Sequence, residues 1–205
     1  MEYLKLLILN LLVSINSLKL SKVNLLFENK NFYVSNNEEI IIHIKGSGTQ
    51  DILGNHFEET NYNIYKGQIL LSSNSKQIYL GSDTEEISEI RLVFDRKLTS
   101  CSYLFENIRI ITFVDLLSFD TSEITDMYYM FYGCHSITSI NLGVFNTAKV
   151  KNFGSIFYEC KSLKEIDISK FDTSSATNMA SMFGDCILLT SLDLSHFVTK
   201  NVESK

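Results

Sequence analysis

The sequence contains no proline and no tryptophan, and it has no excess of basic residues. Asp and Glu number 24 against 18 Lys and Arg, so the formal net charge at pH 7 is -6. Binding to nucleic-acid phosphates requires clustered Lys and Arg side chains. We therefore expect no nucleic-acid partner.

Catalytic and metal-binding motifs are also missing from the sequence. Its histidines, His43, His56, His135 and His196, are scattered, with no HExxH motif, and no serine stands in a GxSxG motif. The segment Gly46–Gly48 lacks the further glycine and the lysine of a phosphate-binding loop. No CxxC motif or Cys/His pair has the spacing of a zinc site. We expect neither an enzyme nor a bound metal or other cofactor.

An apolar run lies close to the N-terminus. Leu6–Ile15 is interrupted only by Asn10 and Ser14, and it follows Lys5. Its length suits the apolar core of a signal peptide and is too short to span a bilayer. We predict a signal peptide over residues 1–17; the alternative is an apolar first helix or strand that caps a sheet. No cysteine follows to carry a lipid anchor, and no C-terminal run predicts a transmembrane span.

The next part of the chain, residues 18–96, is predicted to form a β-rich cap. Short β-rich segments alternate there with polar breakers; they are Phe32–Ser35, Glu39–Lys45, Gln68–Ser72, Gln77–Leu80 and Ile87–Phe94. Ile40–Ile44 is the most strongly predicted strand of the chain. Because an open end of a repeat array exposes apolar core and unpaired strand edges, we expect this region to cover the first repeat.

A repeat with a period of 26 residues organises the remainder. Phe119, Phe145, Phe171 and Phe197 mark it, and the three full units read FDTSEITDMYYMFYGCHSITSINLGV, FNTAKVKNFGSIFYECKSLKEIDISK and FDTSSATNMASMFGDCILLTSLDLSH. A period between about 20 and 50 residues is typical of a solenoid, in which each unit buries its apolar face by stacking on its neighbours.

Each unit contains two apolar periods. Met127, Met130, Phe131 and Cys134 follow the i, i+3, i+4, i+7 spacing of one helix face, and the same columns are apolar in the next two units. Further on, alternation with polar residues is typical of a half-buried strand, as at Ile140–Leu142. We therefore predict an α/β repeat solenoid in which parallel strands form one wall and short helices form the other.

This pattern closely resembles the BspA-like leucine-rich repeats of surface proteins, whose unit runs roughly F-D-T-S-x-V-T-D-M-x-x-M-F-x-x-C-x-S-L-x-x-L-D-L-S. Phe119–Leu142 and Phe171–Ser195 match it nearly position by position, whereas the middle unit has Phe153 and Ile156 where Met is usual. The resemblance covers about half of the chain. It implies cell-surface display, adhesion and binding to other proteins.

These observations give a predicted domain organisation. It consists of a signal peptide (1–17), a β-rich cap region (18–96) and a leucine-rich-repeat solenoid (97–205), the last divided into a degenerate repeat (97–118), full repeats (119–144, 145–170 and 171–196) and a partial repeat (197–205).

The cysteines Cys134, Cys160 and Cys186 share one column of the repeat, while Cys101 lies outside it. Stacking would bring their Cα atoms to about 5 Å from their neighbours, a distance that a disulfide allows. The Cβ vectors of stacked equivalent residues run parallel, however, and do not point at one another. We favour a column of buried free thiols that behave as small apolar residues.

Polar residues form a second set of columns, which the strand pattern directs outward. Neighbouring carboxylates about 5 Å apart repel each other, so a column of Asp is not explained by stability alone. The face binds a basic or hydroxyl-bearing protein partner or a cation, or else its side chains satisfy nearby backbone in solvent. The predicted partner-binding residues are Asp115, Ser139, Asn141, Glu165, Asp167, Ser169, Ser191, Asp193 and Ser195.

The sequence thus favours a secreted or cell-surface protein without enzymatic activity that binds another protein through this sheet face. Two alternatives remain open. One is an intracellular repeat scaffold, which an uncleaved N-terminus would favour. The other is an enzyme whose site lies within Phe27–Arg96, which would need a deep pocket with convergent titratable groups.

Overall fold

The computed structural model describes residues 24–26, 33–35, 38–59, 61–82, 86–143 and 145–203, and the predicted signal peptide lies outside them. The chain divides into two compact units, Met1–Asn36 and Asn37–Lys205. In the first unit, β1 (Asn24–Leu26) pairs antiparallel with β2 (Tyr33–Ser35).

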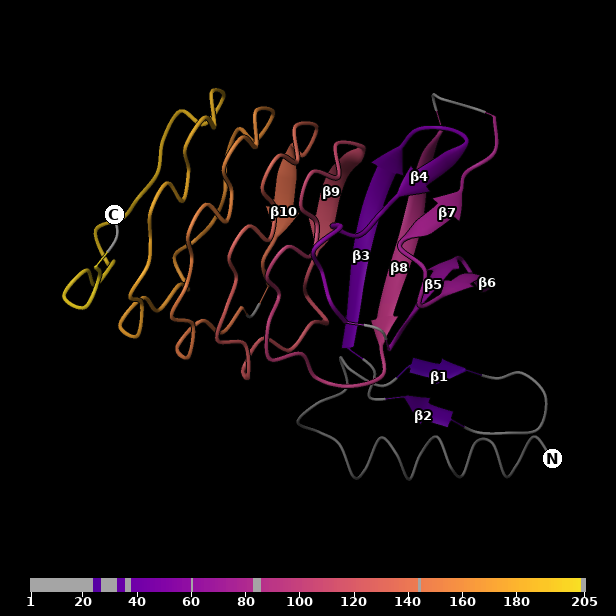
Figure 1. Cartoon of the computed structure of the whole chain (residues 1–205), viewed down its shortest axis with the longest axis horizontal. Helices are drawn as coiled ribbons and strands as arrows, with labels where there is room; N and C mark the ends of the chain where they lie inside the picture. Colours follow the sequence, from indigo (N-terminus) through magenta and orange to yellow (C-terminus); the bar gives the residue numbers. More distant parts are fainter. Residues whose placement is uncertain are drawn as a thin grey trace. The chain divides into compact units, whose positions relative to one another are not determined.

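The second unit contains the other strands drawn in Figure 1. They are β3 (Glu38–Lys45), β4 (Thr49–Asp51), β5 (Tyr62–Lys66), β6 (Ile69–Ser73), β7 (Gln77–Tyr79), β8 (Ile87–Phe94), β9 (Ile111–Asp115) and β10 (Ser139–Asn141). Six of them form one mixed sheet in the order β10-β9-β3-β8-β5-β6, and β4 pairs with β7 separately. Only the β9–β10 pair in these sheets is parallel.

Strand β3 joins the β-rich region to the repeat. It pairs antiparallel with β8 on one side and with β9 on the other. Ile40, Ile42 and Ile44 are fully buried, whereas the intervening side chains are half-buried, which is the alternation expected of a strand with one face on the core. The strong strand predicted at Ile40–Ile44 is confirmed. Because β3 lies between β8 and β9, the β-rich region and the first repeat strands share one sheet and one core.

The predicted α/β solenoid with short helices is wrong. The described residues contain strands, turns and bends but no helix, and their main sheet is mixed. The segments expected to be helical are chains of tight turns. We call the successive passages of the repeat coil 1 (97–118), coil 2 (119–144), coil 3 (145–170) and coil 4 (171–196); Figure 1 shows them following one another from β9 toward the C-terminus.

The backbone hydrogen bonds explain why these segments are not helical. The Met127 N–H donates to the Asn152 carbonyl (2.9 Å) and the Phe131 N–H to the Ile156 carbonyl (2.9 Å), both in the next coil. Between them, the Met130 N–H closes a turn on the Met127 carbonyl (3.2 Å). An α-helix would direct each of these groups to the residue four positions earlier in its own segment. Here alternate N–H groups hold neighbouring coils together instead.

Left-handed backbone conformations recur in the same segments. Tyr129 and Ser155 have φ values of 59° and 51°, and four residues further on Gly133 and Glu159 have φ values of 70° and 57°. Single left-handed residues end a right-handed helical path. Two successive turns of four residues still direct positions i, i+3, i+4 and i+7 inward. The predicted apolar positions of coils 2 and 3 are therefore fully buried even though their conformation differs, whereas most of those in coil 4 are partly buried.

The strand prediction holds for part of the repeat only. In coils 1 and 2 the expected segments form β9 and β10, but residues 165–167 and 191–193 of the later coils form no strand. Aromatic packing continues through all of these coils. The rings of Phe105, Phe131, Phe157 and Phe183 stack in sequence with centroid separations of 5.5, 5.5 and 5.4 Å.

A column of buried threonines links the coils at the corner that follows each repeat Phe. The Thr147 hydroxyl donates to the Asp172 carbonyl (3.0 Å) and accepts from the Asp172 N–H (2.7 Å). Thr121 makes the same pair of bonds to Asn146, and Thr173 makes it to Val198. Each threonine therefore satisfies one donor and one acceptor of the next coil.

Candidate functional site

The predicted sheet face carries side chains that close turns in their own coil. Oxygen Oδ1 of Asp115, Asp167 and Asp193 accepts the N–H group two residues further on, at 2.9, 3.0 and 2.9 Å. Asn141 does the same at 3.2 Å, and its Nδ2 donates to Asp115 Oδ1 at 3.0 Å. One duty of this column is therefore to satisfy local backbone, as expected of Asx turns.

All of the predicted residues of the sheet face lie at the surface. Ser139 and Asp115 are half-buried, and the others, Asn141, Glu165, Asp167, Ser169, Ser191, Asp193 and Ser195, are exposed. A hydrogen bond from the Ser169 hydroxyl, with a second from its N–H, lowers the pKa of Asp167, and Ser195 lowers the pKa of Asp193 in the same way. These carboxylates are therefore ionised at neutral pH, and the column keeps its negative charge.

The structure brings two of the predicted residues together at a small recess. Asn141 and Asp167 line it from neighbouring coils, together with Lys170 and the rings of Phe145 and Phe171. Its volume is about 170 Å³. An apolar floor with an amide, a carboxylate and an ammonium group at the rim could receive a polar side chain of a partner, although it is too small for a drug-sized ligand.

A second surface was not predicted from the sequence. Five half-buried tyrosines gather on the turn segments of coils 1 to 3, and we call them the tyrosine surface; they are Tyr103, Tyr128, Tyr129, Tyr132 and Tyr158. The Tyr129 ring stacks on Tyr128 at 4.0 Å and on Tyr132 at 4.3 Å. Tyr132 stacks in turn on Tyr158 of the next coil at 5.3 Å.

The backbone turns position these rings. Tyr103 and Tyr129 occupy equivalent places in successive coils, and both have positive φ, at 63° and 59°. Positive φ is sterically unfavourable for a bulky L-residue. Tyr103 and Tyr129 adopt it here because packing stabilises the conformation. The only trace in the sequence is that Tyr103 with Tyr129, and Tyr132 with Tyr158, stand one period apart. A comparison of repeat columns that looked beyond the buried positions would have found these pairs.

The hydroxyl groups of four of these residues, Tyr103, Tyr128, Tyr132 and Tyr158, stay protonated at neutral pH. A hydrogen bond with Tyr129, together with burial, raises the pKa of Tyr128 to about 12. Burial raises the pKa of Tyr103 and of Tyr132, and a hydrogen bond with Asp185 raises that of Tyr158. The surface therefore offers neutral hydroxyl donors beside flat apolar rings.

Charged groups border the tyrosine surface on the coil 3 side. His135 Nε2 lies 2.8 Å from Glu159 Oε2, and Lys161 Nζ lies 3.4 Å from the same oxygen. The hydrogen bond from His135, followed by that from Lys161, lowers the pKa of Glu159. An aromatic centre with a charged margin is the composition that protein interfaces favour.

The cysteines are free thiols in this structure. Each column member donates its thiol to the carbonyl of a Phe in the preceding coil, as from Cys134 to Phe105 (3.0 Å) and from Cys160 to Phe131 (3.3 Å). Burial raises the pKa of both thiols, so neither is a ready nucleophile. Within the described ranges, no group of three or more His, Cys, Asp or Glu side chains is arranged to hold a metal ion.

Comparison with known families decides where the repeat belongs. A family model described as "Mycoplasma protein of unknown function, DUF285" matches residues 99–205. The chain belongs to this family. No curated protein and no solved structure gives a significant match. The DUF285 region contains the whole tyrosine surface and every residue of the predicted sheet face. In the part of the chain that the structure describes, no helix has the length and apolar character needed to cross a membrane.

Proposed function

We propose that this chain is a secreted or cell-surface protein that binds another protein through its repeat and has no enzymatic reaction of its own. The close resemblance of Phe119–Leu142 and Phe171–Ser195 to the BspA-like leucine-rich repeats of surface proteins supports the location and the role. Membership of the DUF285 family is consistent with this resemblance, and the family description itself assigns no function.

The tyrosine surface is the observation that carries the proposal. Tyrosine supplies a large, rigid contact area with a polar tip, and it is enriched among the residues that dominate binding energy at interfaces. The five rings contact one another in a continuous series across three coils. A partner that covers them would remove apolar ring area from water while keeping hydrogen bonds to the hydroxyl groups.

The predicted sheet face is the second candidate surface. Its recess offers Asn141, Asp167 and Lys170 to a partner, but its Asp and Asn oxygens are already engaged with local backbone. Such prior engagement reduces what a new hydrogen bond gains. We therefore rank it below the tyrosine surface.

Location is tested in the cells that make the protein. Culture medium, surface proteins released by brief trypsin treatment of intact cells, and cell contents are analysed separately by mass spectrometry. Material outside the cell with an N-terminus between about Ser14 and Ser21 is expected. An intact Met1 found only among the cell contents would contradict the surface role and support the intracellular scaffold.

Binding is tested with the labelled 205-residue chain on an array of immobilised extracellular and surface proteins. For any partner found, the double variant Tyr132→Ala/Tyr158→Ala should raise the dissociation constant at least about thirtyfold, because the loss of a single interface tyrosine that contributes about 2 kcal/mol already has that effect. Asp167→Ala/Asp193→Ala is the matched test of the sheet face. A loss confined to the Asp variant would move the site there, and absence of any specific partner would contradict the proposal.

A further inference from the structure

A recess of about 350 Å³ lies between the repeat and the segment that joins β4 to β5. The joining segment provides His56, Glu58 and Glu59 to its wall, and the coils provide Ser102, Tyr103 and Asp126. All of these residues belong to the second unit. Because Tyr103 lines the recess and is also part of the tyrosine surface, the two sites adjoin.

Contacts with coil 1 hold the joining segment in place. The Gly54 N–H donates to the Leu104 carbonyl at 2.9 Å. Gly54 lies so close to coil 1 that an added Cβ would be 1.9 Å from the Tyr103 carbonyl oxygen. His56 Nδ1 then lies 2.6 Å from Glu106 Oε2 of coil 1. The walls of the recess are therefore positioned before any ligand binds, which lowers the cost of ordering the site.

The recess is acidic. Three carboxylates line it, and no Lys or Arg side chain does so among the described residues. Arg96 Nη2 lies 3.0 Å from Glu59 Oε2 and balances that charge. Within the described ranges, Glu58 and Asp126 have no cationic partner. Asp126 Oδ1 accepts the Tyr128 N–H at 2.9 Å, so this carboxylate is also fixed in orientation.

The negative charge of the recess acts on neighbouring side chains. Burial raises the pKa of Tyr103, and the charges of Glu106 and Asp126 raise it further. Burial, followed by the charges of Glu59 and Asp126, also raises the pKa of the fully buried Cys101. A cation placed among these groups would be stabilised, whereas an anion would be repelled.

Ser102 gives an independent reason to expect a ligand that donates hydrogen bonds. This residue lines the recess, and its Oγ is buried with no hydrogen-bond partner in the described part of the chain. A buried polar atom without a partner destabilises the folded chain. A donor that reaches this hydroxyl would therefore be bound more favourably than one that meets only groups already paired.

We propose that this recess binds the guanidinium group of an arginine side chain from a partner polypeptide. A guanidinium group carries five N–H donors in a planar fork, so it can bond carboxylate and hydroxyl oxygens of the recess at the same time. Its flat face also packs favourably on an aromatic ring, and Tyr103 provides one. Within the described residues, the carboxylates form no cluster arranged to hold a metal ion, so an organic cation suits the site better.

This inference deepens the binding role proposed above and rests on it for the source of the arginine. A partner that covers the tyrosine surface reaches the recess at Tyr103. Binding of the guanidinium group itself can be measured without any partner protein.

The probe is Nα-acetyl-arginine amide, titrated into the isotope-labelled 205-residue chain. The amide shifts of His56, Glu58 and Ser102 in NMR spectra should saturate in the millimolar range, because a single side chain makes few contacts. Nα-acetyl-citrulline amide is the matched control: it has nearly the same shape without the charge, and its dissociation constant should be at least about tenfold higher. Equal binding of the two compounds, or no saturable shift at the recess, would overturn the proposal.

Nα-acetyl-lysine amide tests the choice of a guanidinium over an ammonium group. Its dissociation constant should be at least about threefold higher than that of the arginine compound, because an ammonium group lacks the planar fork. Binding as tight as that of the arginine compound would overturn the assignment to arginine.

A pair of double variants with the same change of charge tests the location. Glu58→Gln/Asp126→Asn removes the two unbalanced carboxylates, while an amide oxygen at position 126 can still accept the Tyr128 N–H. It should raise the dissociation constant of the arginine compound at least about tenfold. Glu86→Gln/Glu89→Gln alters exposed residues outside the recess and should change it less than about twofold. Equal effects of the two double variants would overturn the assignment to this recess.

Glu58→Gln alone keeps the test available if the double variant does not fold, because Glu58 is exposed. It should raise the dissociation constant at least about threefold, and no change would overturn the proposal. Failure here is distinguishable from failure of the proposed function. A chain that binds a partner through its tyrosines but not the arginine compound would overturn only the recess, and the reverse result would overturn only the partner-binding role.

Discussion

At the scale of single residues, buried threonine side chains link neighbouring coils. The threonines of the three F-D-T or F-N-T corners, Thr121, Thr147 and Thr173, are between 1% and 2% exposed. Each hydroxyl bonds a backbone N–H and a carbonyl group of the next coil, which would otherwise lack these partners. A buried hydroxyl that satisfies two backbone groups at once is costly to remove, because both groups lose their partner.

We expect Thr147→Val to lower the free energy of unfolding by about 1–3 kcal/mol, because the Asp172 N–H and carbonyl lose their partner while the shape is conserved. Urea denaturation followed by circular dichroism measures the change. Thr138→Val is the control: Thr138 is exposed and bonds the Thr112 carbonyl at 3.0 Å, so water can replace it at a cost of less than about 0.5 kcal/mol. Equal costs for the two variants would contradict a structural role for the buried column.

The buried columns can be predicted from the sequence because burial follows hydrophobicity directly. Phe131, Phe157 and Cys160 are fully buried as predicted. The role of the Asp and Asn columns could not be predicted from the sequence, since a carboxylate that closes an Asx turn and one that binds a partner can have the same neighbours in sequence. Only the backbone path shows that Asp167 Oδ1 accepts the Ser169 N–H.

At the scale of elements, the turn segments illustrate how one apolar spacing can serve two conformations. The left-handed residues recur every four positions, close to the 3.6-residue turn of an α-helix, so both structures direct the same side chains inward. The periodicity of Met127–Cys134 therefore cannot separate them. What separates them is the destination of the N–H groups, which depends on a neighbouring coil one period away in the sequence.

The direction in which a glycine substitution changes the free energy of unfolding distinguishes the turn conformation from an α-helix. Ser155 has a φ of 51°, a region that glycine adopts without steric cost. We expect Ser155→Gly to raise the free energy of unfolding by about 0.5–1 kcal/mol, and Ser155→Ala to leave it unchanged or lower it slightly. In a helix, Gly would lower it by about 0.5 kcal/mol and Ala would raise it. Thermal and urea melts of both variants therefore test the turn assignment, and the helical order of stabilities would refute it.

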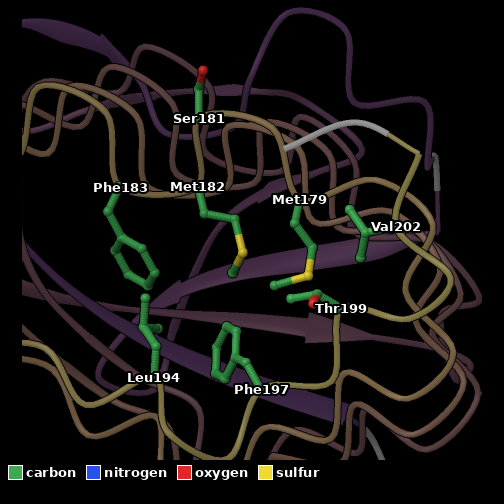
Figure 2. Close-up of a pocket in the computed structure, with 8 residues that line it drawn as sticks. All are labelled: Met179, Ser181, Met182, Phe183, Leu194, Phe197, Thr199 and Val202. Carbon is green, nitrogen blue, oxygen red and sulfur yellow. The ribbon is translucent and has the colours of Figure 1, made fainter.

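At the scale of the whole second unit, stability depends on neighbours along the stack. Strand β3 covers coil 1 by pairing with β9, whereas Leu194 of coil 4 is 44% exposed and lines an apolar pocket with Met182 and Phe183 (Figure 2). The sequence predicted that a β-rich region would precede the repeat, because its alternating segments are local signals. It could not predict that β3 would lie between β8 and β9, since pairing order in a sheet is decided by contacts between distant segments. The sequence does show that two pairs of tyrosines stand one period apart, but the contact of Tyr103 with Tyr128 depends on how the coils stack.

The Phe column tests this dependence on neighbours with one chemical change at two places. The Phe157 ring is fully buried between Phe131 and Phe183, at 5.5 and 5.4 Å, whereas Phe183 is only partly buried and has a single ring neighbour in the column. Phe157→Ala should lower the free energy of unfolding by about 3–5 kcal/mol, because it leaves a closed cavity. Phe183→Ala should cost less than about half as much, because solvent already reaches the site and the chain can close over it. Urea denaturation measures both values, and they are comparable when the unfolding free energy depends on urea concentration with the same slope in both variants. Equal costs would mean that coil 4 is as well covered as coil 3, and the dependence of stability on neighbouring coils would then be refuted.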